Sequence, residues 1–176
     1  IVHRLDRDTS GVMVAARNQK SFIALKEIFQ HRRAEKTYIA IVCGRLTKSE
    51  GVIDYGIGRL ASNPTLRGVA VGRTVLRGTR DALTYYRVLK AGDAYSLVEL
   101  CPQTGRMHQL RVHLKAIGNP IACDMKYGGK KICCPTGCTR QLLHAHSLAF
   151  SFPEGRRLSF EAELPADFAL AIESVF

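Results

Sequence analysis

One acidic residue near the start of the chain, Asp6, is flanked by two arginines, Arg4 and Arg7. Nearby positive charge favours the ionised form of a carboxyl group. Residues 9–11, Thr-Ser-Gly, add short hydroxyl side chains and a permissive backbone, which suit a rigid turn. An ionised carboxylate held beside arginines is what a covalent nucleophile acting on a polyanion requires. A plain Asp–Arg pair that caps a turn would have the same residues, so this stretch alone leaves both interpretations open.

Two further stretches could carry chemistry. Tyr38 stands in a run of β-branched and aromatic residues, where core packing is the commonest role of a tyrosine. Gly105 precedes a predicted helix whose first turn carries Arg106 and His108, and the amino end of a helix suits a phosphate or a carboxylate. His113 follows on a different face of that helix. We therefore expect both histidines at the helix surface and no metal shared between them.

The charge balance is strongly positive, with 26 lysines and arginines against 15 aspartates and glutamates and a formal net charge of +11. A globular chain needs no such excess to fold, so a polyanionic partner is the simplest explanation, with nucleic acid ahead of an anionic membrane surface. No apolar run approaches the roughly 20 residues that a membrane-spanning helix needs. Arginines at 59, 67, 73, 77 and 80 lie in or beside the glycine-punctuated segment 61–81. We interpret that segment either as a solvated loop or as a phosphate-binding one.

The elements that must position these residues alternate in type. Local patterns predict strands at 11–16, 37–43, 82–90, 94–100, 142–152 and 157–164, and helices at 21–31, 107–117 and after Pro165. Ser21 is the expected cap of the first helix, residues 51–60 suit a twisted strand or hairpin, and 61–81 is the least structured part. Strand pairs with a few interposed helices predict an α+β domain on a mostly antiparallel sheet. The length of 176 residues predicts one domain, 1–176.

The chain has six cysteines, at positions 43, 101, 123, 133, 134 and 138. It is too large and too apolar to need disulfides for its stability, so we expect a reducing, cytoplasmic location and free thiols in the loop that carries the last three. Cys133, Cys134 and Cys138 with His144 or His146 could in principle bind zinc. Their spacing fits no standard zinc pattern, and we expect no metal.

Six short motifs occur along essentially the whole chain. They are HRLD with TSG at 3–11, KTYIA at 36–40, TGR with HQ and RVH at 104–113, GNPI at 118–121, D with YGG at 124–129, and LHA at 143–145. In this order and at this approximate spacing, they resemble the RluA-type family of RNA pseudouridine synthases. The resemblance implies an α+β fold with a long bent antiparallel sheet, flanking helices and a central cleft for a flipped nucleotide.

The resemblance also implies roles for individual residues. Asp6 matches the catalytic aspartate, which attacks the target uridine and lets the base detach, rotate and rejoin through carbon. Tyr38 matches the tyrosine that packs on the base and is implicated in late proton removal. Arg106 matches the basic residue that pairs with the catalytic carboxylate, Arg4 the arginine that fills the space left by the flipped nucleotide, and Leu143 the apolar residue beneath the target ring.

Further expectations concern RNA binding and partners. His3, Arg7, His108 and Arg111 are the remaining candidate RNA-binding residues. Isomerisation involves neither redox chemistry nor hydrolysis, so no cofactor is expected. The expected partner is a ribosomal or transfer RNA. We expect the chain to be a monomer that requires no protein partner and binds no membrane. The family's catalytic domain normally has an upstream strand with a Lys-Pro element, so residues 1–176 are expected to lack an N-terminal portion.

Two other functional classes are compatible with a basic chain. A non-catalytic RNA-binding module would be expected to have lost Asp6, Tyr38 or Arg106, and all three are present. A metal-dependent nucleic-acid hydrolase would need clustered carboxylates, whereas Asp6 and Asp8 stand nearly alone among arginines. The residues therefore favour the isomerase.

Overall fold

The computed structural model describes residues 1–72, 74–129 and 132–176, so Arg73 of the arginine-rich segment and Lys130 and Lys131 of the cysteine loop lie outside the described residues. Within the described residues the main sheet has seven strands, in the order β1-β9-β2-β8-β7-β3, with β10 also paired to β9. The strands are β1 (Ser10–Gly11), β2 (Glu35–Cys43), β3 (Glu50–Asp54), β7 (Leu83–Ala91), β8 (Tyr95–Pro102), β9 (Leu143–Ser151) and β10 (Arg157–Glu161). Only the β1–β9 pair is parallel among these described strands. The predicted α+β fold on a mostly antiparallel sheet is confirmed.

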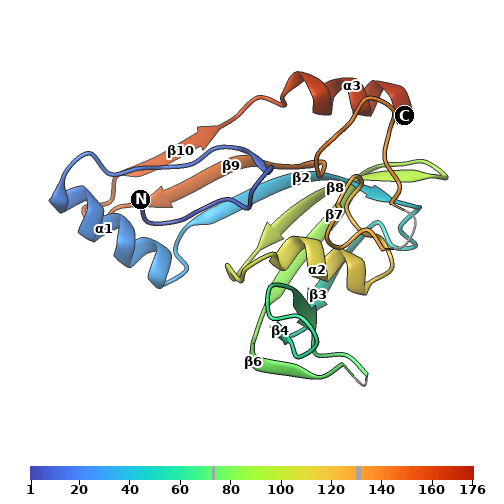
Figure 1. Ribbon diagram of the computed structural model, residues 1–176. Helices are drawn as coiled ribbons and strands as arrows, with labels where there is room; N and C mark the ends of the chain where they lie inside the picture. Colours follow the sequence, from blue (N-terminus) through green and yellow to red (C-terminus); the bar gives the residue numbers. More distant parts are fainter. Residues whose placement is uncertain (73, 130–131) are drawn as a thin grey trace.

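The helices lie on both sides of this sheet (Figure 1). They are α1 (Gln19–Gln30), α2 (Gln109–Ala116) and α3 (Ala166–Val175) in the described part of the chain. Alternate residues of β2 face opposite sides, because Ile39 and Ile41 belong to the apolar cluster that includes α3, whereas Ala40 and Val42 belong to the cluster that includes α2. A strand covered on both faces needs an unbroken apolar run, which is why residues 39–42 show no polar alternation.

A second, smaller sheet lies below the main one in Figure 1. In the described residues its order is β5-β4-β6, all antiparallel, formed by β4 (Ile57–Leu60), β5 (Arg67–Val69) and β6 (Leu76–Arg80). We call these three strands the small sheet. The prediction of one twisted strand or hairpin at 51–60 is wrong in both forms, because this stretch contains two strands, β3 and β4, that belong to different sheets. The prediction that 61–81 is the least structured part is wrong too, since it contains β5 and β6.

Glycines explain the error in the small sheet. A Cβ atom built on Gly58 would lie 2.9 Å from the Leu76 Cβ, and one on Gly68 would lie 2.8 Å from a Leu60 methyl carbon. These glycines therefore permit close approach between neighbouring strands, whereas the sequence pattern suggested chain breaks.

The remaining predicted elements are confirmed with shifted ends, apart from two at the start of the chain. The predicted strand at 11–16 is wrong beyond Gly11, because the parallel pairing joins only Ser10 to His144 and Gly11 to Ala145. The predicted cap at Ser21 is wrong as well. Asn18 caps α1, its side-chain oxygen accepting the Ser21 N–H at 2.9 Å.

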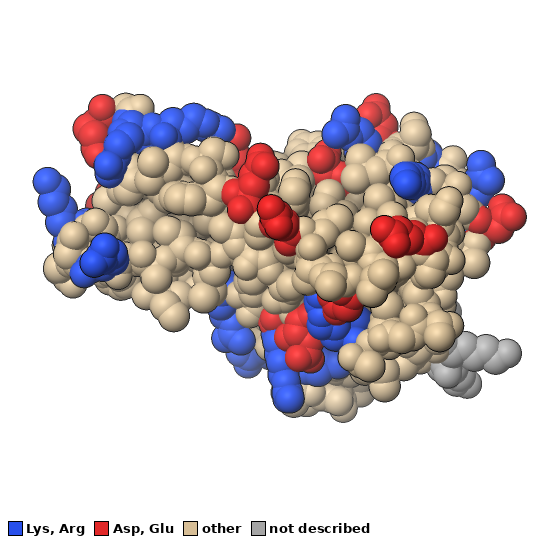
Figure 2. All heavy atoms as spheres, turned by 90° about the horizontal axis from the view of Figure 1, so that it is seen from above, with Lys and Arg blue, Asp and Glu red and all other residues tan. Residues whose placement is uncertain are grey.

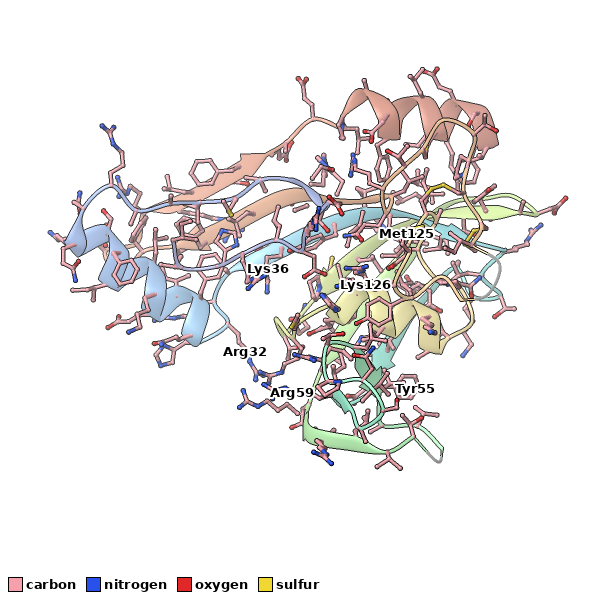
Figure 3. All side chains as sticks on the ribbon, in the orientation of Figure 1. Arg32, Lys36, Tyr55, Arg59, Met125 and Lys126 are labelled. Atoms are coloured by element: carbon pink, nitrogen blue, oxygen red, sulfur yellow. A yellow bond between two sulfur atoms is a disulfide. The ribbon has the colours of Figure 1, made fainter. Side chains whose placement is uncertain are left out.

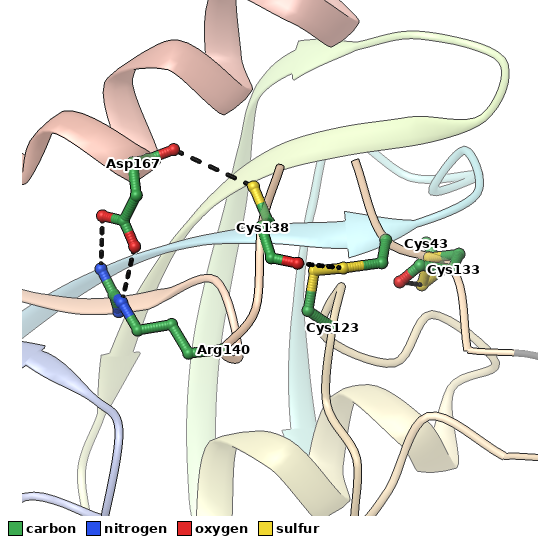
Figure 4. The surroundings of a disulfide bond; sticks show 7 residues. Cys43, Cys123, Cys133, Cys138, Arg140 and Asp167 are labelled. Carbon is green, nitrogen blue, oxygen red and sulfur yellow. Dashed lines mark hydrogen bonds and ion pairs between the residues drawn. A yellow bond between two sulfur atoms is a disulfide. The ribbon is translucent and has the colours of Figure 1, made fainter. Parts of the chain in front are cut away.

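Two disulfides connect the cysteine loop to the rest of the fold in the described residues, Cys43–Cys133 and Cys123–Cys134 (Figure 4). The prediction of free thiols is therefore wrong at Cys133 and Cys134, because folding brings them to cysteines 90 and 11 residues away. Cys138 is a free thiol, as predicted. The sequence argument for a reducing compartment assumed free thiols, and this assumption does not hold for the four paired cysteines.

No group of three or more histidine, cysteine, aspartate or glutamate side chains in the described ranges is arranged to hold a metal ion. His144 and His146, the other candidate zinc ligands, instead place a ring nitrogen 3.1 Å from the Ala162 carbonyl oxygen. Among the same residues, none of the helices has the length and apolarity to cross a membrane.

Candidate active site

A cavity of about 280 Å³ opens between the N-terminal stretch, β2, β9 and the turn that leads into α2. The N-terminal stretch contributes Arg4 and Asp6, and β2 contributes Tyr38. The turn and α2 contribute residues 104–111, and β9 contributes Leu143. The fold thus brings together segments about 30 and 100 residues apart.

The turn that carries Asp6 is fixed by its own backbone. The Thr9 N–H donates to the Asp6 carbonyl oxygen at 3.1 Å, and Asp8 adopts a left-handed conformation with φ of 67°. Gly11 has φ of 121°, and a Cβ atom there would overlap the Ala145 backbone. Only glycine allows β1 to approach β9 this closely, so the glycine of the TSG sequence, Gly11, is a packing requirement of the site.

Residues 140–144 hold the same turn from outside. The Gln141 side-chain N–H₂ donates to the Arg7 carbonyl and the Thr9 hydroxyl, both at 2.9 Å. Arg140 donates to the Asp8 carbonyl at 3.2 Å, and its guanidinium also pairs with Asp167 of α3 at 2.7 Å and 2.8 Å. The loop bearing the candidate nucleophile is therefore anchored by the C-terminal part of the chain.

The cation beside Asp6 is Arg111. Its Nη1 lies 3.5 Å from an Asp6 carboxylate oxygen, and the side chain of Arg111 is almost fully buried. Its Nε and Nη2 atoms donate to the two carboxylate oxygens of Asp124, both at 2.7 Å. Burial by itself lowers the pKa of Arg111, but the hydrogen bonds and charges of Asp124 and Asp6 raise it on balance. Arg111 is therefore a fixed cation beside Asp6.

Asp124 is itself fully buried and fully engaged. Besides the Arg111 fork, one of its oxygens accepts the backbone N–H groups of Lys126 and Tyr127 at 3.0 Å each. The ring of Tyr127 lies under the Arg111 guanidinium, 5.1 Å from centroid to Cζ. The sequence placed Asp124 and Tyr127 in a motif without a role, because nothing local indicates a partner 13 residues upstream.

Arg106 does not pair with Asp6, and that prediction is wrong. Its Nε donates to the Asp81 carbonyl oxygen at 3.0 Å, although its side chain does line the cavity. The difference arises because α2 begins only at Gln109, after His108 in a left-handed conformation with φ of 58°. Arg106 therefore precedes the helix, and Arg111 is the arginine in its first turns.

Gln109 fixes that turn to the sheet. Its side-chain oxygen accepts from the Thr104 hydroxyl at 2.7 Å and the Arg106 N–H at 2.9 Å. Its amide group donates to the Leu83 carbonyl and the Thr84 hydroxyl, both at 3.0 Å. The floor of the cavity is thereby tied to β7.

His108 and His113 are buried, so their predicted place at the helix surface is wrong. The Nδ1 of His108 lies 2.6 Å from the Tyr127 hydroxyl, and the ring nitrogens of His113 lie 3.0 Å from the Thr84 hydroxyl and the Tyr55 carbonyl. Burial lowers the pKa of both histidines. The error arises because the main sheet, the small sheet and the 124–128 loop cover more than one face of α2.

Tyr38 and Leu143 form the apolar wall of the cavity. Ala40, two residues after Tyr38 on β2, pairs with Leu143 on β9. The side chains of Tyr38 and Leu143 therefore pack in the same apolar cluster. Burial, with the nearby charge of Asp6, raises the pKa of Tyr38 to about 12. The phenol is therefore neutral near pH 7 and presents an uncharged aromatic surface.

The remaining predicted residues divide into two groups. Arg4 lines the cavity. His3 and Arg7 do not: His3 stacks on Phe29 at 4.5 Å and its Nε2 accepts the Val14 N–H, while the Arg7 side chain is exposed beside Asp8. One charged residue of the cavity, Lys36, was not among the predicted site residues. Burial, and then the charge of Arg32, lower the pKa of Lys36. Its position at the cavity depends on where β2 begins, which the local pattern does not indicate.

Comparison with known proteins gives consistent results. The model of a family described as RNA pseudouridylate synthase matches residues 1–116. An uncharacterized RNA pseudouridine synthase of Mycobacterium bovis is 41% identical over 175 residues, which cover 98% of this chain and 55% of that protein. The ribosomal large subunit pseudouridine synthase D of Nitrosomonas europaea is 37% identical over 184 residues, covering 99% and 51%.

A solved structure is similar too. That of human RNA pseudouridylate synthase domain containing 1 superimposes with a TM-score of 0.82 at 31% identity, covering 93% of this chain and 68% of that one. The chain spans about half the length of the bacterial relatives given above.

Proposed function

Because the chain belongs to the RNA pseudouridylate synthase family, we propose that it isomerises uridine to pseudouridine in structured RNA. The observation that carries the proposal is the arrangement of the cavity, in which the Asp6 carboxylate lies 3.5 Å from the buried Arg111 guanidinium and shares the space with Tyr38. A nucleophile, a fixed cation and an aromatic wall are the parts that this reaction needs.

In the proposed reaction, the Asp6 carboxylate forms a bond to C1′ of the target nucleotide as the bond between C1′ and N1 of uracil breaks. The base rotates within the cavity, and its C5 displaces the carboxylate from C1′, which frees Asp6. C5 then loses its proton and N1 gains one, so the reaction is an isomerisation with no net change in atoms. Arg111, held by Asp124, orients the attacking carboxylate with its positive charge. Tyr38 and Leu143 hold the planar base during rotation. The neutral Tyr38 phenol assists the late loss of the C5 proton as a relay, its oxygen accepting that proton while its own hydroxyl proton passes on.

The target base must leave its helix before it can enter a cavity of this size, at a cost of a few kcal/mol of unstacking. We propose that Arg4, at the mouth of the cavity, fills the space that the flipped nucleotide leaves. Relatives are named for the ribosomal large subunit, so ribosomal RNA is the first substrate to test and transfer RNA the second.

We propose further that the chain acts as a monomer in the cytoplasm, where these RNAs are available. The isomerisation has no redox or hydrolytic step, so we propose that it needs no metal and no organic cofactor. Activity that is unchanged by EDTA and by dialysis would support this.

The test uses unmodified transcripts of large-subunit ribosomal RNA and of transfer RNA, with pseudouridine detected by carbodiimide modification and primer extension. The chain should form pseudouridine, and Asp6→Ala should form none while binding the RNA as tightly. Pseudouridine formed by Asp6→Ala would refute the role of Asp6. RNA binding without any pseudouridine from the unaltered chain would favour a non-catalytic RNA-binding module.

A further inference from the structure

Another cavity, of about 440 Å³, lies between the small sheet and the turn before α2. The arginines that line it come from all three strands of the small sheet and from that turn: Arg59, Arg67, Arg77, Arg80 and Arg106. Residues 105–107 line this cavity and also the one that holds Asp6, so the two are adjacent. We call the second cavity the arginine groove.

The charges of the arginine groove are not neutralised within the described part of the chain. None of its arginines takes part in the ion pairs found there. Arg67 donates instead to the carbonyl oxygens of Pro64 and Leu66 at 3.0 Å and 3.1 Å, and Arg106 donates to that of Asp81. Neutral carbonyl groups thus orient the guanidinium groups of Arg67 and Arg106 and leave their positive charge available.

Other cations lie close to the groove. The pKa of Arg106 is lowered by burial and then by the charges of Arg32 and Arg80, with only Asp81 acting in the opposite direction. Figure 3 shows Arg32, Lys36 and Arg59 on the same side of the molecule, between α1 and the small sheet. By contrast, the face in Figure 2 mixes basic and acidic side chains. The groove and the cations beside it therefore form a positively charged patch.

The other lining residues indicate which part of a polyanion would bind. Besides its arginines, the groove is lined by Ile57, Met107 and three glycines, with no aromatic and no acidic side chain among its described lining residues. Proteins that read single-stranded bases stack them on aromatic rings. Arginine recognises phosphate oxygens without regard to the base.

We propose that the arginine groove binds the phosphates of the RNA strand that adjoins the target uridine, independently of its sequence. This inference rests on the proposed function, because it takes RNA as the substrate. A strand lying in the groove reaches the cavity with Asp6 across residues 105–107, the wall common to both.

The test compares two double variants that each remove two exposed arginines. Arg77→Gln/Arg80→Gln alters the groove, and Arg17→Gln/Arg45→Gln alters exposed arginines that line neither cavity. The probe is a fluorescein-labelled single-stranded RNA of mixed sequence, whose binding is followed by anisotropy across a series of potassium chloride concentrations. The slope of log K against log salt falls by about 0.7 for each lost phosphate contact on a single strand. The groove variant should therefore lose about 1.4 from this slope, and the control variant should lose nothing.

An equal loss in the two variants, or no loss in the groove variant, would overturn the proposal. So would a loss confined to one base composition when oligo-uridine and oligo-adenosine are compared. Pseudouridine formation by the unaltered chain is measured on the same preparation. If it forms pseudouridine while the two variants have equal slopes, the groove fails alone. If it forms none while only the groove variant loses slope, the isomerase proposal fails and the groove stands. A chain that does not bind RNA overturns both.

Discussion

Replacing Asp124 by asparagine should damage both stability and catalysis, although Asp124 does not line the cavity that holds Asp6. The substitution keeps the size of the side chain and exchanges one carboxylate oxygen for an N–H₂ group. At least one of the two 2.7 Å hydrogen bonds from Arg111 is then lost, and the buried guanidinium no longer faces a full negative charge.

The cost of the change follows from burial. Removing one partner of a buried ion pair typically costs about 3–5 kcal/mol, because the other charge is left uncompensated. Asp124 is fully buried and Arg111 nearly so, so the cost expected for a buried ion pair applies to the free energy of unfolding of Asp124→Asn. A hydrogen bond to a charged group is worth about 1.5–3 kcal/mol, so loss of a well-placed Arg111 beside Asp6 should lower kcat roughly ten- to hundredfold.

Glu35→Gln is the matched control. Glu35 also forms a two-pronged pair with an arginine, Arg157, at 2.9 Å and 2.8 Å, but both side chains are exposed and neither lines the cavity. Exposed ion pairs contribute little to stability. Urea unfolding should therefore show a large loss for Asp124→Asn and almost none for Glu35→Gln.

Single-turnover pseudouridine formation at saturating RNA, measured well below both unfolding temperatures, should separate the two variants in the same way. Equal effects of the two substitutions would refute the reasoning, because they would show that burial of the pair near Asp6 does not matter. A large loss of stability for Asp124→Asn with unchanged kcat would refute only the claim that Arg111 positions Asp6, and the argument about burial and stability would stand.

Two further predictions concern pH and the cysteines. Burial holds the pKa of His113 below its ordinary value of 6.5, so the unfolded chain binds more protons than the folded one. The free energy of unfolding should therefore fall as pH drops through 6.5. His113→Gln should flatten this pH dependence in urea titrations, and an unchanged slope would contradict the prediction. Without reductant, a thiol reagent should label only Cys101 and Cys138 in the denatured chain. Reduction should lower the free energy of unfolding by about 2–4 kcal/mol per disulfide. Labelling of all six cysteines without reductant would show that the two disulfides do not form.

Much of the fold is present in local patterns. The apolar run of β2, the β7–β8 hairpin and the amphipathic α1 are set by side-chain periodicity over a few residues, so their positions were predicted to within a few residues. The motif around Asp6 likewise marks the candidate nucleophile, because its arginines and its glycine are adjacent in the chain.

The partners of these residues were decided only by the tertiary structure. Arg111 lies 105 residues from Asp6, and Cys133 lies 90 residues from Cys43. Such distances are set by how α2 and the cysteine loop pack on the sheet, which no local spacing encodes. The same packing buries His113. The close approach of strands at Gly58 and Gly68 likewise allows the glycine-rich segment to form the small sheet. The sequence by itself therefore marked Asp6 as the candidate nucleophile, and the packing of α2 between the two sheets determined which arginine lies beside it.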